Sequence, residues 1–175
     1  VVEMTLPPWV PLFSRAGAVV TDVGGILSHT SIVARRMRCP AVVGTNIGTT
    51  VINTGSIFGN IIFEGGAGNV VTNLAGGVIS APTTLNLSGG LLQNAGTLHV
   101  GGIGTIGTTT LTGDLVQSSP GSVHIDIDPA RGRTDLLQIS GRAALDGAIV
   151  VNPISVRKGT SGPVITAAGG LTVAP

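Results

Sequence analysis

A histidine that closely follows two glycines is the residue of this chain best suited to do chemistry. It is His29, within residues 21–35, TDVGGILSHTSIVAR. Gly24 and Gly25 allow a tight backbone turn, and Ser28 is a preferred residue for beginning a helix. His29 then lies in the first helical turn, where free N–H groups and the helix dipole favour an anion. Because imidazole is a usable nucleophile at neutral pH, the pattern predicts that His29 accepts a phosphoryl group.

The neighbours of His29 supply the remaining parts of such a site. We expect Thr21 to orient the imidazole ring and Arg35 to help neutralise the charge of the phosphoryl group. This interpretation assigns the chemistry to His29, Thr21 and Arg35, and the contacts to the phosphoryl group to Gly24, Gly25 and Ser28. The alternative is that His29 only caps a helix in a domain that does no chemistry.

A short βαβ unit is predicted to hold this motif. Residues 17–21 are an apolar run typical of a buried strand, and residues 41–43 are a second one. Between them, apolar residues recur at helical spacing from Ser28 to Arg38, and Pro40 ends the helix. The motif therefore lies between two strands, at the start of the helix that joins them.

These residues resemble the swivelling phosphohistidine domain, or mobile domain, of PEP-utilising enzymes. That family includes pyruvate phosphate dikinase, phosphoenolpyruvate synthase and rifampicin phosphotransferase. The similarity covers residues 7–13 (PPWVPLF), the motif around His29 and residues 39–45 (CPAVVGT). It implies that His29 shuttles a phosphoryl group from an ATP site to a second substrate site, and that Thr21 belongs to the motif as well.

The resemblance also implies partners that this stretch does not contain. About 45 residues cover only the middle of such a domain, so we interpret residues 1–47 as a partial mobile domain. Thr30 and Ser31 replace a common pair of alanines, and Arg36 replaces a common acidic residue. The family implies ATP and Mg²⁺, bound by an ATP-grasp domain, and a separate acceptor domain. We expect this chain alone to bind no cofactor, and we find no set of metal ligands.

The composition changes near residue 45. Residues 1–45 hold the only Trp, the only Cys, both Met and four of the 28 glycines, Gly17, Gly24, Gly25 and Gly44. Residues 48–175 are predicted to form a second domain, with the joint between residues 45 and 55. The sequence begins as if within a strand, so we expect a piece of a longer protein.

The second domain shows a repeat of about twenty residues. Asn53, Asn73 and Asn94 each begin a similar Gly-containing segment, at spacings of 73 − 53 = 20 and 94 − 73 = 21 residues. A period of this length without a helical pattern predicts a β-solenoid, here of about six coils. The three asparagines are expected on neighbouring coils, stacked in a hydrogen-bonded ladder. The predicted fold class is mainly β, a right-handed parallel β-helix preceded by the truncated βαβ unit.

The second domain resembles an autotransporter passenger. The similarity covers residues 92–102 (LQNAGTLHVGG), 107–117 (GTTTLTGDLVQ), 134–141 (TDLLQISG) and 144–152. It implies an exported, surface-located β-helix whose partner is an outer-membrane β-barrel. The main interpretation is therefore a passenger fragment fused to a carrier fragment that is inactive alone. The alternative is a fragment of a phosphotransferase in which His29 carries the phosphoryl group.

A third class of function rests on acidic residues in residues 122–128, SVHIDID. Strict alternation predicts that Val123, Ile125 and Ile127 face inward and that Asp126 and Asp128 face outward. Paired carboxylates occur in β-helical enzymes that cleave polysaccharides, but a solvated outer face is the preferred interpretation. Asp135 is expected to cap a turn rather than bind calcium, and the two histidines of this half, at positions 99 and 124, are expected to be isolated.

Charge and composition exclude some partners and leave the location open. The net charge is +1 over 175 residues, so no basic field attracts nucleic acid. Charged residues make up only 10% of the chain while hydrophobic ones make up 42%, which argues against disorder. If the β-helix determines the location, the protein is expected at the cell surface or secreted. If the phosphohistidine part determines it, the protein is expected in the cytoplasm.

Overall fold

The computed structural model describes residues 19–21, 41–43, 48–63, 66–155, 159 and 162–174. The chain forms two compact units. One consists of Val1–Thr49 with Gly65–Ala67, and the other of Thr50–Glu64 with Gly68–Pro175. In the described part of the chain, no helix has the length and apolar character needed to cross a membrane.

The described part of the first unit is a pair of short strands. Strand β1 (Val19–Thr21) lies parallel to β2 (Ala41–Val43), and Thr21 is in register with Val43. Both strands agree with the apolar runs of the sequence, and their parallel pairing is the one that a βαβ unit requires. The helix predicted from Ser28 to Arg38 lies outside the described residues.

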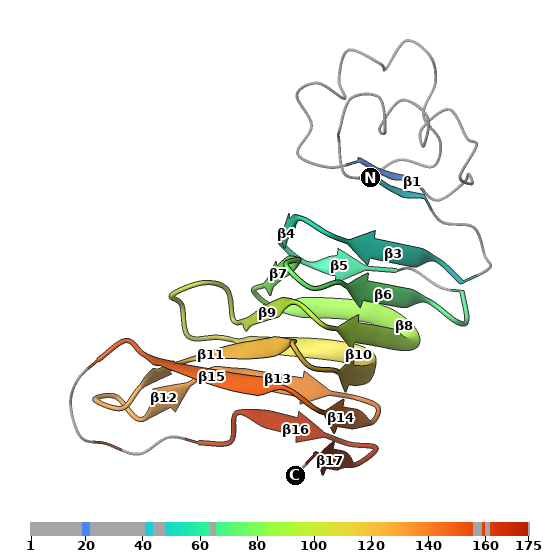
Figure 1. The fold of residues 1–175 in the computed structure, drawn as a ribbon. Helices are drawn as coiled ribbons and strands as arrows, with labels where there is room; N and C mark the ends of the chain where they lie inside the picture. The colour runs from blue at the N-terminus through green and yellow to red at the C-terminus, as the bar shows by residue number, and fades with distance from the viewer. Residues whose placement is uncertain are drawn as a thin grey trace. The chain divides into compact units, whose positions relative to one another are not determined.

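The second unit is a parallel β-solenoid, as the sequence predicts (Figure 1). Its strands stack in three faces, and each face is a column of strands from successive coils. The first face contains β5 (Ile61–Ile62), the first part of β8 (Thr84–Asn94), the first part of β10 (Thr108–Gln117), β13 (Leu136–Ile139) and β16 (Ile165–Ala167).

The other two faces complete each coil. The second face contains β3 (Thr50–Asn53), β6 (Val70–Asn73), the last parts of β8 and β10, β14 (Ala143–Leu145) and β17 (Leu171–Val173). The third face contains β4 (Ser56–Phe58), β7 (Val78–Ala81), β9 (Thr97–Val100), β11 (Ser122–Asp128) and β15 (Ala148–Pro153). A short strand, β12 (Arg133–Thr134), pairs antiparallel with β11. Four described coils have all three faces, from β5 to β15, and β3–β4 and β16–β17 form partial coils at the two ends.

Alternating side chains build the core of this unit. In β10, every second residue from Thr109 to Gln117 is buried, as a strand with one inward face requires. Inward residues of successive coils are in register, for example Ile79, Leu98 and Val123 on the third face, all fully buried. Each such side chain contributes about 1.5–3 kcal/mol by leaving water. These columns hold the coils together, because a single coil cannot bury its apolar side chains unless neighbouring coils stack on it.

An asparagine ladder runs through the corner between the second and third faces. Asn53, Asn73 and Asn94 are in register on β3, β6 and β8, which confirms the ladder expected from their spacing. The Nδ2 group of Asn53 donates to Oδ1 of Asn73 at 2.8 Å, and Nδ2 of Asn73 donates to Oδ1 of Asn94 at 2.8 Å. The same Nδ2 groups also donate to backbone carbonyls of the turns. The ladder therefore binds each turn to its own strand and to the next coil.

Candidate functional site

The phosphohistidine motif lies in the connection between β1 and β2. These parallel strands need a crossover connection, and residues 22–40 supply one that exceeds the usual minimum of about a dozen residues. Thr21 is the last residue of β1, so the two glycines, Ser28 and His29 follow the carboxyl end of a parallel strand. Ligand sites of open parallel sheets lie at that edge. In the sequence, the motif therefore directly follows the kind of strand end at which a site is expected.

Most of the predicted site residues lie outside the described residues. These are Gly24, Gly25, Ser28, His29 and Arg35. Of Thr21, the structure describes the backbone pairing with Val43. The assigned roles of these residues therefore stay predictions.

Comparison with known proteins bears directly on this region. Residues 1–65 match the family described as PEP-utilising enzyme, mobile domain. The N-terminal region is homologous to this mobile domain. The match includes β1, β2 and the motif around His29. It also runs past the expected joint and takes in β3, β4 and β5, which pair with strands of the solenoid.

Three curated relatives show how small a part of a mobile-domain protein this chain matches. A probable phosphoenolpyruvate synthase of Staphylothermus marinus is 53% identical over 55 residues, 31% of this chain and 7% of that protein. The uncharacterized phosphotransferase YvkC of Bacillus subtilis is 44% identical over 70 residues, 40% of this chain and 8% of that protein. A phosphoenolpyruvate synthase of Pyrococcus furiosus is 35% identical over 96 residues, 55% of this chain and 11% of that protein.

The solenoid gains no such support. No solved structure matches the chain. The family match is confined to residues 1–65, so it says nothing for the autotransporter resemblance of residues 92–152. For this half of the chain, the structure establishes the fold, which is a parallel β-solenoid.

The solenoid carries a second group of ionisable side chains, on and beside β11. Contrary to the expectation of a solvated outer face, Asp126 and Asp128 are buried, with 7% and 0% of their surface exposed. Val123 and Ile125 are buried as predicted, whereas Ile127 is only partly buried. Strict alternation fails here because the adjacent residues Ile125 and Asp126 are both buried, and the buried carboxylates bond to side chains of a later segment.

Residues later in the chain bind the two carboxylates. Asn152 donates from Nδ2 to Oδ1 of Asp126 at 2.6 Å. Asp128 accepts from Nη1 of Arg131 at 2.8 Å and from Oγ of Ser155 at 2.7 Å. The hydrogen bond from Arg131, followed by that from Ser155, lowers the pKa of Asp128. This carboxylate is therefore ionised and fully engaged, and it fixes the turn between β11 and β12.

Asp135 satisfies the backbone of a loop, as expected for a turn cap. Its carboxylate accepts the N–H of Gly107 at 2.8 Å and the N–H of Asp126 at 2.6 Å. Burial raises the pKa of Asp135 to about 6, against the effect of these two hydrogen bonds. Because Asp135 has no exposed surface and both oxygens are engaged, it cannot reach a sugar substrate. Asp126 and Asp128, on which the polysaccharide-cleaving hypothesis rests, are buried as well, so the structure gives that hypothesis no exposed carboxylate pair on β11.

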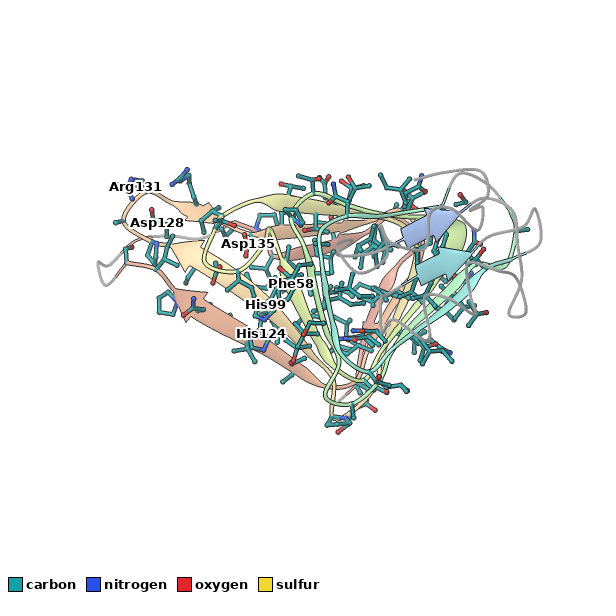
Figure 2. All side chains as sticks on the ribbon, turned by 90° about the horizontal axis from the view of Figure 1, so that it is seen from above. Phe58, His99, His124, Asp128, Arg131 and Asp135 are labelled. Atoms are coloured by element: carbon teal, nitrogen blue, oxygen red, sulfur yellow. The ribbon has the colours of Figure 1, made fainter. Side chains whose placement is uncertain are left out.

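The two histidines of the solenoid are not isolated, which corrects the sequence prediction. His99 of β9 and His124 of β11 are in register on neighbouring strands, and their ring centroids lie 4.6 Å apart (Figure 2). Burial, and then the proximity of His124, lower the pKa of His99. The sequence missed the pair because 25 residues separate the two histidines, and the loop 101–107 makes this coil longer than twenty residues. A strand-by-strand alignment of Leu98-His99 with Val123-His124 would have found it.

Proposed function

We propose that the N-terminal part of this chain is a phosphohistidine carrier and that His29 bears the phosphoryl group. The observation that carries this proposal is the match of residues 1–65 to the mobile domain of PEP-utilising enzymes, which contains the motif around His29. The parallel pairing of β1 with β2 supports it, because it leaves the motif at the carboxyl end of a strand.

The proposed chemistry is two successive transfers. A nitrogen of the His29 imidazole attacks the phosphorus of a nucleotide phosphate. The attacked atom is the β-phosphorus of ATP: the P–N bond forms as the P–O bond to the departing AMP breaks, and water then removes the γ-phosphate, so that one phosphoryl group stays on His29. An oxygen of the acceptor then attacks the same phosphorus, and His29 leaves as neutral imidazole once it holds its proton again. Amides of Gly24, Gly25 and Ser28 hold the phosphoryl oxygens, Arg35 balances their charge, and Thr21 orients the ring.

The donor and acceptor sites belong to partner domains in this proposal. The chain spans between 7% and 11% of the three relatives described above, so it contains a small part of such a protein. The family uses ATP with Mg²⁺, and its mobile domain works with the other domains of the enzyme. We assign ATP and Mg²⁺ to an ATP-grasp partner and the second substrate to an acceptor partner.

We propose two functional parts for the chain, residues 1–47 for the carrier and residues 48–175 for the solenoid. Residues 48–65 lie within the family match and also contribute β3, β4 and β5 to the stacked faces. The boundary between the two parts is therefore a stretch of residues that both parts share, and not a single position.

A surface-passenger function for the solenoid is the second candidate. It rests on the parallel stacking of the coils and on the buried ladder of Asn53, Asn73 and Asn94. These features give a scaffold of stacked coils whose turns are bonded from one coil to the next. An exported passenger with an outer-membrane β-barrel as partner would use that scaffold as its surface-exposed stalk. We rank this function second because the comparisons favour the carrier.

The experiment that tests the carrier function follows a labelled phosphoryl group. The full chain is incubated with [β-³²P]ATP, Mg²⁺ and the ATP-binding part of a phosphoenolpyruvate synthase. We expect a label on the chain that is stable in alkali and lost in acid, as a phosphohistidine requires. His29→Ala removes the label, whereas no loss in His29→Ala would refute the proposal.

A matched pair of arginine variants tests the assigned roles. Arg35→Ala should slow labelling by about a hundredfold, the lower end of the effect of losing one charge-stabilising donor. Arg38→Ala removes a charge from the same predicted helix and should label at the wild-type rate. Equal rates for the two variants would contradict the role of Arg35.

A further inference from the structure

One pair of metal-ligating side chains in the described part of the chain has no place in the carrier function. His99 and His124 lie on the third face of the solenoid, on the neighbouring strands β9 and β11. Their ring centroids are 4.6 Å apart and their planes are inclined by 52°. Both residues are partly buried rather than enclosed, so solvent reaches part of each side chain. Two imidazoles are thus held side by side by paired backbones.

The surroundings of the pair contain negative charge. Asp126 lies two residues beyond His124 on β11, and its carboxylate interacts electrostatically with the ring of His99. Its Oδ1 is held by the Nδ2 group of Asn152 at 2.6 Å. The nearest described cation along the strand, Arg131, is engaged by Asp128. In register, the pair is flanked by Ser80 and Val150, which carry no charge. A bound cation would therefore meet no described positive side chain in this row.

We propose that His99 and His124 together bind one divalent transition-metal ion of the zinc type. Imidazole nitrogen is a preferred ligand of Zn²⁺, Ni²⁺ and Cu²⁺. With Zn–N bonds of about 2.0–2.1 Å, two nitrogens on one ion are about 3.3 Å apart in a tetrahedral site. The ring centroids are 4.6 Å apart, close enough for one nitrogen of each ring to come within that separation.

The proposed site is open and exchangeable. Among the described residues, no group of three or more His, Cys, Asp or Glu side chains is arranged to hold a metal. The ion would therefore keep water at its remaining positions, unlike a closed structural zinc site with four protein ligands. Burial and the neighbouring His124 lower the pKa of His99.

Calorimetric titration of the full chain with ZnCl₂ alone, at pH 7.5 in a phosphate-free buffer, tests the proposal. We expect one Zn²⁺ per chain. His99→Gln and His124→Gln should each weaken binding by at least about tenfold, the smallest effect typical of losing even a supporting partner of a metal ligand. His29→Gln removes the one other histidine of the chain and should leave binding unchanged.

The opposite outcomes overturn the proposal. They are the absence of binding by the wild-type chain, equal affinities in wild type and both solenoid variants, or a loss of binding in His29→Gln. Circular dichroism checks that each variant is folded. Should a variant unfold, proton NMR of the wild-type chain decides. Ring resonances of two of the three histidines must shift together as Zn²⁺ is added, and unchanged resonances would refute the site.

Discussion

The side chain of Asn73 donates a hydrogen bond from Nδ2 to Oδ1 of Asn94, 2.8 Å away and one coil further along the solenoid. The same group donates to the carbonyls of Gly77 and Thr97. Asn73 has no exposed surface, so water cannot replace these bonds. One residue thus joins a turn, its own coil and the next coil.

Asn73→Ala should therefore lower the free energy of unfolding of the solenoid by at least about 2 kcal/mol, since each buried polar group left unpaired costs about 1–3 kcal/mol. Gln93→Ala, which removes an exposed amide from the neighbouring strand, should change it by less than about 0.5 kcal/mol. Urea unfolding followed by circular dichroism measures both. Equal effects would mean that the ladder is not stabilising.

A matched pair of glycine variants tests how closely the coils approach. A Cβ atom at Gly96 would lie 2.6 Å from the carbonyl oxygen of Leu74, whereas one at Gly55 would have no atom within 4 Å. Both glycines follow a ladder asparagine by two residues. Gly96→Ala should destabilise the solenoid by about 1–3 kcal/mol through overpacking, and Gly55→Ala should be nearly neutral. Thermal unfolding of the two variants measures the difference, and a neutral Gly96→Ala would contradict the stacking.

Two leucines show that the packed coils and the last coil differ in burial. Leu98 is fully buried, and Leu171 is 46% exposed. Leu98→Ala should cost about 2–5 kcal/mol, as buried leucines do, and Leu171→Ala should cost clearly less, about 1 kcal/mol. Chemical denaturation of both variants gives the two values. Reversal of the order would show that the last coil is more tightly packed than the structure has it.

Asp135 predicts a dependence of stability on pH. Its pKa is raised from 3.8 to about 6 in the folded chain, so the folded state binds this proton more tightly than the unfolded state. The stabilisation is complete below about pH 4 and is lost as the pH rises through about 6. The free energy of unfolding of the wild type, relative to Asp135→Asn, should therefore fall between pH 4 and pH 7. Urea titrations of both proteins at four pH values measure it, and a constant difference would contradict the raised pKa.

The sequence predicted the fold best where the same residue type recurs at the same spacing. Asn53, Asn73 and Asn94 recur at nearly equal spacing, and that spacing located one corner of the solenoid and its register. The next residues of this column are Gln117 and Leu145, aligned by backbone pairing alone. Both the residue type and the coil length change there, so no pattern in the sequence marks them.

Burial on the third face was the least predictable feature. Alternation placed Asp126 and Asp128 outside, and the structure buries both. Their partners, Asn152 and Ser155, come from a segment 26 and 27 residues further along the chain. A local pattern cannot contain such partners. For the same reason, the contact between His99 and His124 follows from the stacking of coils and not from their separation in sequence.

The most direct test of the carrier function is mass spectrometry of the peptide that contains His29. ATP and Mg²⁺ alone should leave it unmodified, because a histidine at a helix start cannot activate a nucleotide without a site that positions the donor and its metal. The only lysine of the chain is Lys158, and no Gly-rich phosphate loop ends in it. Adding the ATP-binding part of a phosphoenolpyruvate synthase should add one acid-labile phosphoryl group at His29. An unmodified His29 in the presence of that partner, or a phosphoryl group on another residue, would contradict the account.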